Sequence, residues 1–112
     1  MNSSLDSTFA ALADPTRRAI LMRLARGETT VMNLAKPFKM SQPAISQHLK
    51  VLAEAGLITT TVRGQERPRR LETAPLKKAI DWIEKYRQMW EKRYKVLDGL
   101  LEELQTMQGD KK

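Results

Sequence analysis

Apolar residues recur at three- and four-residue steps along most of the chain, which predicts a mainly α-helical protein. The expected helices are Leu5–Ala13, Thr16–Arg26, Val31–Phe38, Ser41–Gly56 and a long one from Pro75 to about Met107. Between the last two lie β-branched and extended runs, Leu57–Val62 and Arg67–Thr73, separated by the turn sequence 63–66. This order predicts helices followed by one β-hairpin and a terminal helix.

The stretch from Ser41 to Gly56 reads SQPAISQHLKVLAEAG and has two contrasting faces. Ile45, Leu49 and Leu52 form an apolar stripe, Ser41 is a good N-cap, and Gly56 can supply a left-handed stop. Uncharged hydrogen-bonding side chains and one lysine occupy the other face: Gln42, Ser46, Gln47 and Lys50. Because glutamine can bond adenine bidentately and serine can pair with several base edges, this face predicts a helix that reads the DNA major groove.

The helix predicted before it, Val31–Phe38, is capped by Thr30 and separated from Ser41 only by Lys39-Met40. A link this short forces a steep crossing, which is helix-turn-helix geometry. Lys39 departs from the glycine often found in such a turn, where positive φ is common. The alternative is an ordinary helical hairpin without a DNA-binding role.

The extended runs after Gly56 predict a two-stranded wing. Pro68 lies in the second run, and proline is tolerated on an edge strand, so one side of this hairpin is expected to be free. Arginines concentrate here and could hold phosphates or enter a minor groove: Arg63, Arg67, Arg69 and Arg70. The alternative is a solvated charged loop.

The N-terminal residues Met1–Ser4 are expected to be frayed, and Asp14-Pro15 is a strong signal for the start of a second helix. That helix directs Ile20, Leu21 and Leu24 inward, and its arginines are expected to point largely outward: Arg17, Arg18, Arg23 and Arg26. An arginine-rich face is usually solvated, and contact of one or two arginines with phosphate is the alternative.

The terminal helix carries more apolar surface than one side of so small a domain could cover. Pairing with a second copy of the chain, beside the N-terminal helix, would bury the excess. The residues expected at this dimer interface are Leu5, Phe9, Leu12, Ile83, Trp90, Tyr94, Leu97, Leu101 and Leu104. Residues 1–112 are therefore expected to form one domain, with 1–13 and 75–108 in dimer contacts, 30–56 as helix-turn-helix and 57–74 as wing.

Charge supports a polyanionic partner. The 112 residues hold 20 Lys or Arg against 13 Asp or Glu, giving a net charge of +7 and favouring nucleic acid or an anionic membrane surface. There is no cysteine and only one histidine, His48, and no paired acids suggest a catalytic pocket, so an enzyme is not expected. The sequence has neither a bilayer-spanning apolar run nor a secretory leader, which predicts a cytoplasmic protein.

The runs LADPTRRAILMRLARGE and SQPAISQHLKVLAEAGLI, followed by a hairpin and a long helix, resemble the arsenical-resistance regulator (ArsR) family of winged helix-turn-helix repressors. The resemblance covers about Phe9 to Thr73 by motif. It implies a homodimer that binds a palindromic operator and usually represses its own operon.

Metal-sensing members carry a cysteine pair in the pattern E-L-C-V-C-D-L, which here reads Glu28-Thr29-Thr30-Val31-Met32-Asn33-Leu34. Neither thiolate is present, and one histidine alone is not a metal site, so no metal or other cofactor is expected. For His48 a phosphate contact or a structural hydrogen bond is expected instead.

The expected function is thus a homodimeric repressor that binds double-stranded DNA. Gln42, Ser46 and Gln47 would read bases, while Ser41, Lys50 and the wing arginines would hold phosphate. The alternative is a winged-helix module for protein–protein interaction. The inducing signal is left open between a small hydrophobic ligand, a partner protein and simple autoregulation.

Overall fold

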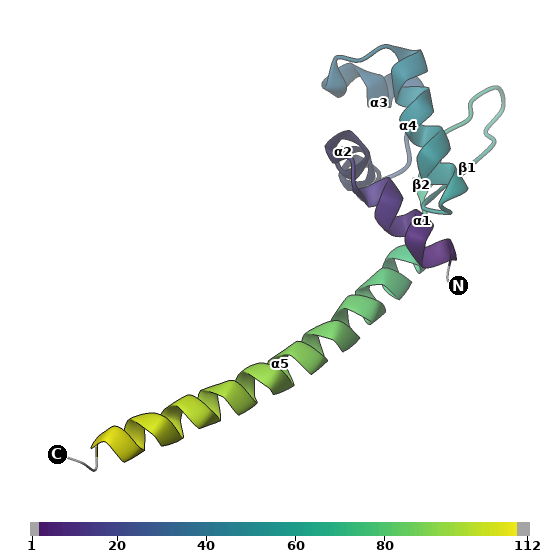
Figure 1. Ribbon diagram of the computed structural model, residues 1–112. Coiled ribbons are helices and arrows are strands. Elements are labelled where there is room, and N and C mark those ends of the chain that lie inside the picture. Colours follow the sequence, from purple (N-terminus) through teal and green to yellow (C-terminus); the bar gives the residue numbers. More distant parts are fainter. Residues whose placement is uncertain (1–2, 110–112) are drawn as a thin grey trace. The chain divides into compact units, whose positions relative to one another are not determined.

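The computed structural model describes residues 3–109, which form five helices and one antiparallel hairpin (Figure 1). The elements are α1 (Ser3–Leu12), α2 (Pro15–Leu24), α3 (Val31–Phe38), α4 (Gln42–Glu54), β1 (Ile58–Thr60), β2 (Arg69–Leu71) and α5 (Ala74–Gly109). The predicted architecture, mainly α with a hairpin wing after the helix-turn-helix, is confirmed. The contacts divide the chain after Ala79 into two units, and the second unit begins within α5 at Ile80.

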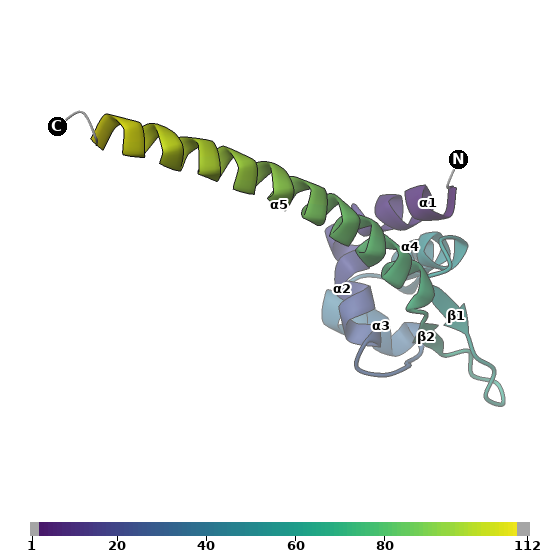
Figure 2. The same cartoon turned by 90° about the horizontal axis from the view of Figure 1, so that it is seen from below.

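The first unit is built around the apolar stripes of α2, α3 and α4. Ile20, Leu34, Ile45 and Leu52 are completely buried, and Leu57 joins them directly after α4. The stripe expected on α4 is confirmed, because Ile45, Leu49 and Leu52 are its buried residues. Two views at right angles show α3 and α4 side by side with the hairpin following α4 (Figures 1 and 2). This core fixes which face of α4 remains free.

Side-chain caps set the starts of the three central helices. Asp14 Oδ1 accepts from the Arg17 backbone N–H at 3.0 Å, and Thr30 and Ser41 accept in the same way from residues 33 and 44, both at 3.3 Å. The predicted caps are therefore confirmed. The predicted end of α2 at Arg26 is two residues too late, because α2 closes at Leu24 into a turn that leads to Gly27 (φ 142°).

Lys39 closes α3 in the left-handed conformation, with φ of 54° and ψ of 36°. Among the described residues it is the one non-glycine with positive φ. The turn of the helix-turn-helix thus requires the backbone that favours glycine, and a lysine adopts it. At the end of α4, Gly56 has φ of 75°, as its sequence position predicted.

The N-terminal helix differs from its prediction. Ser3 and Ser4, expected to be frayed, are helical; Met1 and Asn2 lie outside the described residues. The most deeply buried residues of α1 are Thr8 and Ala11, each 1% exposed. The expected stripe of Leu5, Phe9 and Leu12 is half-buried. Thr8 can be buried because its hydroxyl donates to the carbonyl of Ser4 at 3.0 Å.

Arg17 and Arg18 do not simply face solvent. The Arg17 guanidinium donates to the carbonyls of Ala11 (2.7 Å) and Ala10 (3.1 Å), and Arg18 donates to the carbonyl of Leu12 at 2.8 Å. These carbonyls end α1 and have no partners within the helix. The two arginines therefore join the end of α1 to the first turn of α2, a role that neither sequence-based alternative included.

The hairpin is shorter than predicted but has the expected antiparallel pairing, with Ile58 opposite Leu71 and Thr60 opposite Arg69. The expected free side of the second strand is wrong at one position. Arg69 exchanges two backbone hydrogen bonds with Thr29, at 2.7 and 3.1 Å. Pro68 has no backbone N–H to donate, but both of these hydrogen bonds are made by the next residue, Arg69, so the proline does not prevent them. The base of the wing is thus fixed to the segment that precedes α3.

From Ile80 onward α5 exposes large apolar side chains along its whole described length. Trp82 and Tyr86 stack with ring centroids 5.7 Å apart, and Trp90 and Tyr94 meet edge to face at 4.5 Å. Within residues 3–109, none of the helices combines the length and apolar character needed to cross a membrane. The sequence predicted more apolar surface on this helix than the domain could cover, and in the single chain these apolar side chains are indeed exposed.

Candidate nucleic-acid interface

The outward face of α4 carries polar side chains. Packing of Ile45 and Leu49 against the core leaves the opposite side of the helix free. The predicted base-reading residues Gln42, Ser46 and Gln47 are all exposed, and so is Lys50. Ser41 is exposed as well, and its hydroxyl oxygen already accepts from the Ala44 N–H. The structure therefore brings these residues to one surface.

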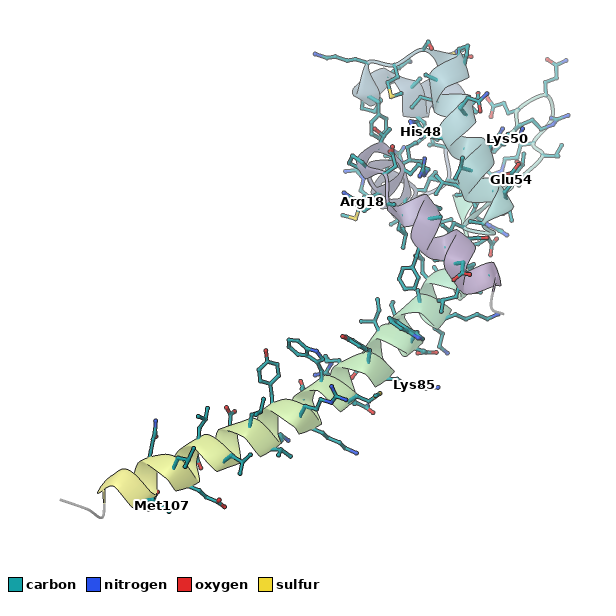
Figure 3. All side chains as sticks on the ribbon, viewed as in Figure 1. Arg18, His48, Lys50, Glu54, Lys85 and Met107 are labelled. Carbon is teal, nitrogen blue, oxygen red and sulfur yellow. The ribbon has the colours of Figure 1, made fainter. Side chains whose placement is uncertain are left out.

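His48 lies on a different side of α4. It is half-buried, and Figure 3 shows it across the helix from Lys50. The pKa of the Asp14 carboxyl, the cap of α2, is lowered chiefly by the Arg17 backbone N–H, and the charge of nearby His48 acts in the same direction. This position separates His48 from the exposed polar face.

The four wing arginines have different partners. Arg63 forms an ion pair with Glu28, and Arg70 donates to Glu72 at 2.9 Å. Arg67 donates to the carbonyls of Gly64 (3.2 Å) and Glu66 (3.0 Å), and Arg69 donates to the carbonyl of Arg67. A carboxylate partner neutralises the charge of Arg63 and of Arg70, whereas a carbonyl partner does not neutralise the charge of an arginine. Arg67 and Arg69 should therefore attract an anion more strongly than Arg63 and Arg70 do.

A hollow of about 450 Å³ lies where the start of α4 meets the wing. It brings together Gln42, Arg67 and Arg69, which are far apart in the sequence. The remaining lining comes from the start of α3 and the hairpin turn: Thr30, Val31, Met32, Gln65 and Glu66. None of these five was a predicted site residue. Their proximity depends on how the hairpin folds back, which no local sequence signal describes.

Comparisons with known proteins agree with this geometry. The profile described as "Bacterial regulatory protein, arsR family" matches residues 14–60. The transcriptional repressor SdpR of Bacillus subtilis (strain 168) is 38% identical over 79 residues, covering 70% of this chain and 88% of that protein. The chain belongs to the arsR family. A second relative, the HTH-type transcriptional regulator Rv2034 of Mycobacterium tuberculosis (strain ATCC 25618 / H37Rv), is 47% identical over 73 residues, which cover 65% of this chain and 68% of that protein.

Solved structures of proteins described as ArsR-like or as a possible ArsR-family regulator show the same fold. An ArsR-like transcriptional regulator from Rhodococcus sp. RHA1 has a TM-score of 0.76 at 33% identity, covering 88% of this chain and 92% of that one. The homodimeric winged helix-turn-helix DNA-binding domain Mb0332 from Mycobacterium bovis has a TM-score of 0.62 at 25% identity, covering 78% and 82%. The winged helix-turn-helix assignment is thereby confirmed, and the chain is a transcriptional regulator of the ArsR family.

The residues at the family's cysteine positions do not fit a thiolate metal site in this ArsR-family chain. Thr30 is engaged as the cap of α3, and Met32 offers only an exposed thioether. Among residues 3–109, His, Asp and Glu nowhere gather in a group of three or more that could hold a metal ion.

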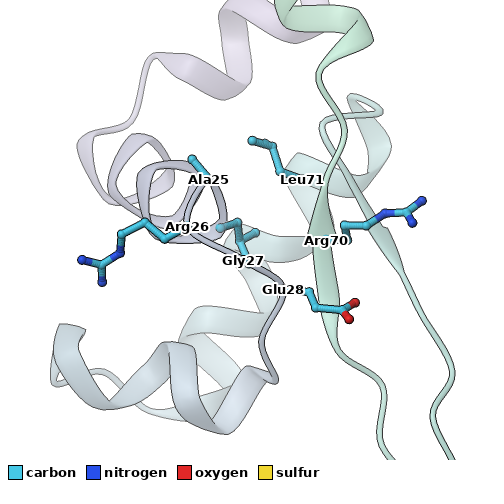
Figure 4. Close-up of a pocket in the computed structure, with 7 residues that line it drawn as sticks. Ala25, Arg26, Gly27, Glu28, Arg70 and Leu71 are labelled. Carbon is cyan, nitrogen blue, oxygen red and sulfur yellow. The ribbon is translucent and has the colours of Figure 1, made fainter.

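A second hollow, of about 490 Å³, lies between the end of α2 and β2 (Figure 4). It is lined by Leu24, Ala25, Arg26, Gly27, Glu28, Arg70 and Leu71. Figure 4 shows the Arg26 and Arg70 side chains directed to opposite sides, away from each other. Because its charged groups do not converge on one point, this hollow lacks the arrangement of a small-molecule site.

Proposed function

We propose that the chain is a sequence-specific transcriptional repressor that acts in the cytoplasm as a homodimer on a palindromic operator, controls its own operon and does not respond to metals. One observation carries this proposal: the free face of α4 presents the hydrogen-bonding side chains Gln42, Ser46 and Gln47 beside Lys50, and it adjoins a hollow lined by Arg67 and Arg69. A surface kept only for solubility would not need glutamines at this place.

In this proposal Gln42, Ser46 and Gln47 contact base edges from within the major groove. Ser41, Lys50, Arg67 and Arg69 contact phosphates and fix the position of α4. Arg63 and Arg70 add less, because each already has a carboxylate partner. For His48 we favour a structural role beside Asp14 over a DNA contact.

The homodimer is supported by the exposed apolar surface of α5 and by the description of Mb0332 as homodimeric. The proposed interface comprises Leu5, Phe9, Leu12, Ile83, Trp90, Tyr94, Leu97, Leu101 and Leu104. Two recognition helices related by a twofold axis would reach major grooves about 34 Å apart. Repression is supported by the relative SdpR, which is a transcriptional repressor.

A gel shift with DNA from upstream of the protein's own gene tests the base-reading residues. Each of Gln42→Ala and Gln47→Ala should weaken specific binding by about 1–3 kcal/mol while leaving binding to random DNA nearly unchanged. Gln88→Ala, an exposed glutamine on α5, is the matched control and should bind like wild type. Undiminished promoter binding by the double variant would refute the assignment.

If wild type does not retard the promoter even at low salt, the protein-interaction function becomes the better account. The non-metal proposal has its own test. Zn²⁺ or arsenite at low concentration should leave both the melting temperature and operator affinity unchanged. A large shift with either ion would contradict it.

A further inference from the structure

Glu28 lies in the segment that joins α2 to α3, and its carboxylate is the partner of a wing arginine. It forms an ion pair with Arg63, the first residue of the hairpin turn. The Glu28 side chain is 23% exposed, whereas the Arg63 side chain is 65% exposed. Arg63 is therefore held by Glu28 on one side and open to solvent on the other.

The segment around Glu28 holds the wing at two places. Thr29, the next residue, exchanges two backbone hydrogen bonds with Arg69 at the base of the hairpin. Arg63 and Glu66 exchange two more across the turn, at 3.1 and 2.9 Å. The backbone of Thr29 thus fixes the base of the wing, and the Glu28 carboxylate reaches its turn.

The position of this turn matters for α4. Gln65 and Glu66, within the turn, line the hollow of about 450 Å³ that also contains Gln42 at the start of α4. A wing held in this place can contact the same duplex as α4 only at a fixed offset. Loss of the pair between Glu28 and Arg63 would give the turn more freedom, because this contact with the segment before α3 would be gone.

Glu28 pairs with Arg63 and not with the other arginines near it. Arg26 and Arg70 line a hollow together with Glu28. Figure 4 shows the Arg26 side chain directed away from Glu28, and Arg70 already donates to Glu72 at 2.9 Å. Arg63 is therefore the arginine whose charge depends on Glu28.

This ion pair acts on DNA binding through charge and position more than through folding stability. Exposed ion pairs contribute little to stability, because water screens them. The Glu28 carboxylate nevertheless cancels one positive charge at the turn of the wing. Non-specific affinity comes almost entirely from positive charges that contact phosphates, whereas base contacts supply sequence preference. The state of Arg63 therefore matters most for DNA that α4 does not recognise.

We propose that Glu28 is a specificity-determining positioning residue, which holds the turn of the wing and keeps Arg63 from contacting phosphates on non-operator DNA. On arbitrary DNA the protein can shift until a free arginine meets a phosphate, whereas on the operator α4 fixes the register. Release of Arg63 therefore strengthens binding to arbitrary DNA more than binding to the operator. This inference rests on the proposed function and adds the residue that limits binding elsewhere.

Glu28→Gln tests the role directly, because glutamine keeps the size of the side chain and removes its charge. Titrations with promoter and random duplexes over a range of salt concentrations measure affinities and slopes. For random DNA the slope of log affinity against log salt should steepen by about 0.9, the value for one added phosphate contact. The ratio of promoter to random affinity should fall roughly two- to fivefold, as expected when an exposed ion pair is lost.

Glu54→Gln is the matched control for net charge. Glu54 is an exposed glutamate of α4 that forms no ion pair among the described residues, so its removal releases no arginine. The salt slope of this variant should match that of wild type. Steepening of the slope by both variants alike would overturn the proposal, because the effect would then come from net charge.

The pair itself is tested by removing Arg63. In an Arg63→Gln background, Glu28→Gln should change neither slope nor affinity ratio, because no arginine is left to release. Arg63→Gln alone should leave the slope for random DNA unchanged, and this measurement does not require that the Glu28 variant folds. A slope reduced by about 0.9 would mean that Arg63 contacts phosphate despite Glu28 and would overturn the proposal.

Wild type separates failure of this inference from failure of the proposed function. No retardation of promoter DNA by wild type at low salt would remove both. Retardation by wild type, together with an unchanged slope in Glu28→Gln, would leave the proposed function standing and remove only the role of Glu28.

Discussion

Lys39 adopts a left-handed backbone at the turn between α3 and α4. For a residue with a Cβ this conformation costs about 1–2 kcal/mol, part of which glycine avoids. We expect Lys39→Gly to raise the free energy of unfolding by about 1 kcal/mol in urea denaturation. Lys36→Gly, within α3, is the matched control and should lower stability by a similar amount. Equal destabilisation by both would show that Lys39 is not strained.

Asp14, the N-cap of α2, is expected to contribute to the loss of folding stability at acid pH. The Arg17 backbone N–H lowers the pKa of this carboxyl below its ordinary value, and the Thr16 N–H and the charges of His48 and Arg17 act in the same direction. A lowered folded-state pKa contributes stability that is present above the unfolded pKa, near 3.9, and lost as pH falls through the folded value.

We therefore expect Asp14→Asn, which keeps a capping oxygen, to flatten the loss of stability below about pH 4. Thermal melts of wild type and variant across the acid range measure this effect. The two proteins should differ most above the ordinary pKa and converge in strong acid. A constant difference at every pH would mean that the charge of Asp14 is not involved.

For single residues, the sequence predicted the helix caps and the glycine that ends α4, but it did not predict hydrogen-bond partners on another helix. Asp14, Thr30, Ser41 and Gly56 act within three or four residues of themselves, so the local sequence contains the whole signal. Arg17 is different, because its guanidinium bonds carbonyls six and seven residues earlier, across a change of helix direction. Helical periodicity alone places such a side chain in solvent.

Among the elements, the wing carries arginines that are not equally free to contact phosphate, because some of them already pair with a carboxylate. Under the proposed function Arg67→Ala should lower the slope of log affinity against log salt by about 1, because it removes one phosphate contact. Arg70→Ala should change the slope less, since Arg70 already pairs with Glu72. Operator titrations between low and moderate salt measure both slopes. Equal slopes for the two variants would contradict the distinction.

Helices were easier to predict than the hairpin for a physical reason. The stripe of α4 repeats over several turns and its ends carry their own caps. Each strand has only three residues, and part of the pairing of Arg69 is with Thr29, far away along the chain. For the same reason the hollow beside Gln42 could be predicted only in part. The sequence identified its arginines, Arg67 and Arg69, as candidates for binding DNA. It did not predict that Thr30–Met32 would line the same hollow, because that depends on tertiary contacts.

For the whole molecule, burial of the exposed apolar side chains of α5 in the proposed homodimer would make stability depend on association. If they are buried between two copies, the apparent melting temperature should rise with protein concentration by mass action. Replacing Leu97 by Glu should remove this dependence and lower the melting temperature, because a charge would then enter the interface. Calorimetry over a hundredfold concentration range is the measurement. Identical melting curves throughout would exclude a dimer coupled to folding.

Under the proposed function, the two backbone hydrogen bonds between Arg69 and Thr29 would have a consequence for the choice of DNA site. They fix the base of the hairpin to the segment that leads into α3, so wing and helix-turn-helix cannot swivel independently. When both touch one duplex, the spacing between their contact points is set by the protein. The DNA must then supply the adjustment, by narrowing a groove or bending at a flexible step. Base pairs that no side chain touches would in this way still influence affinity.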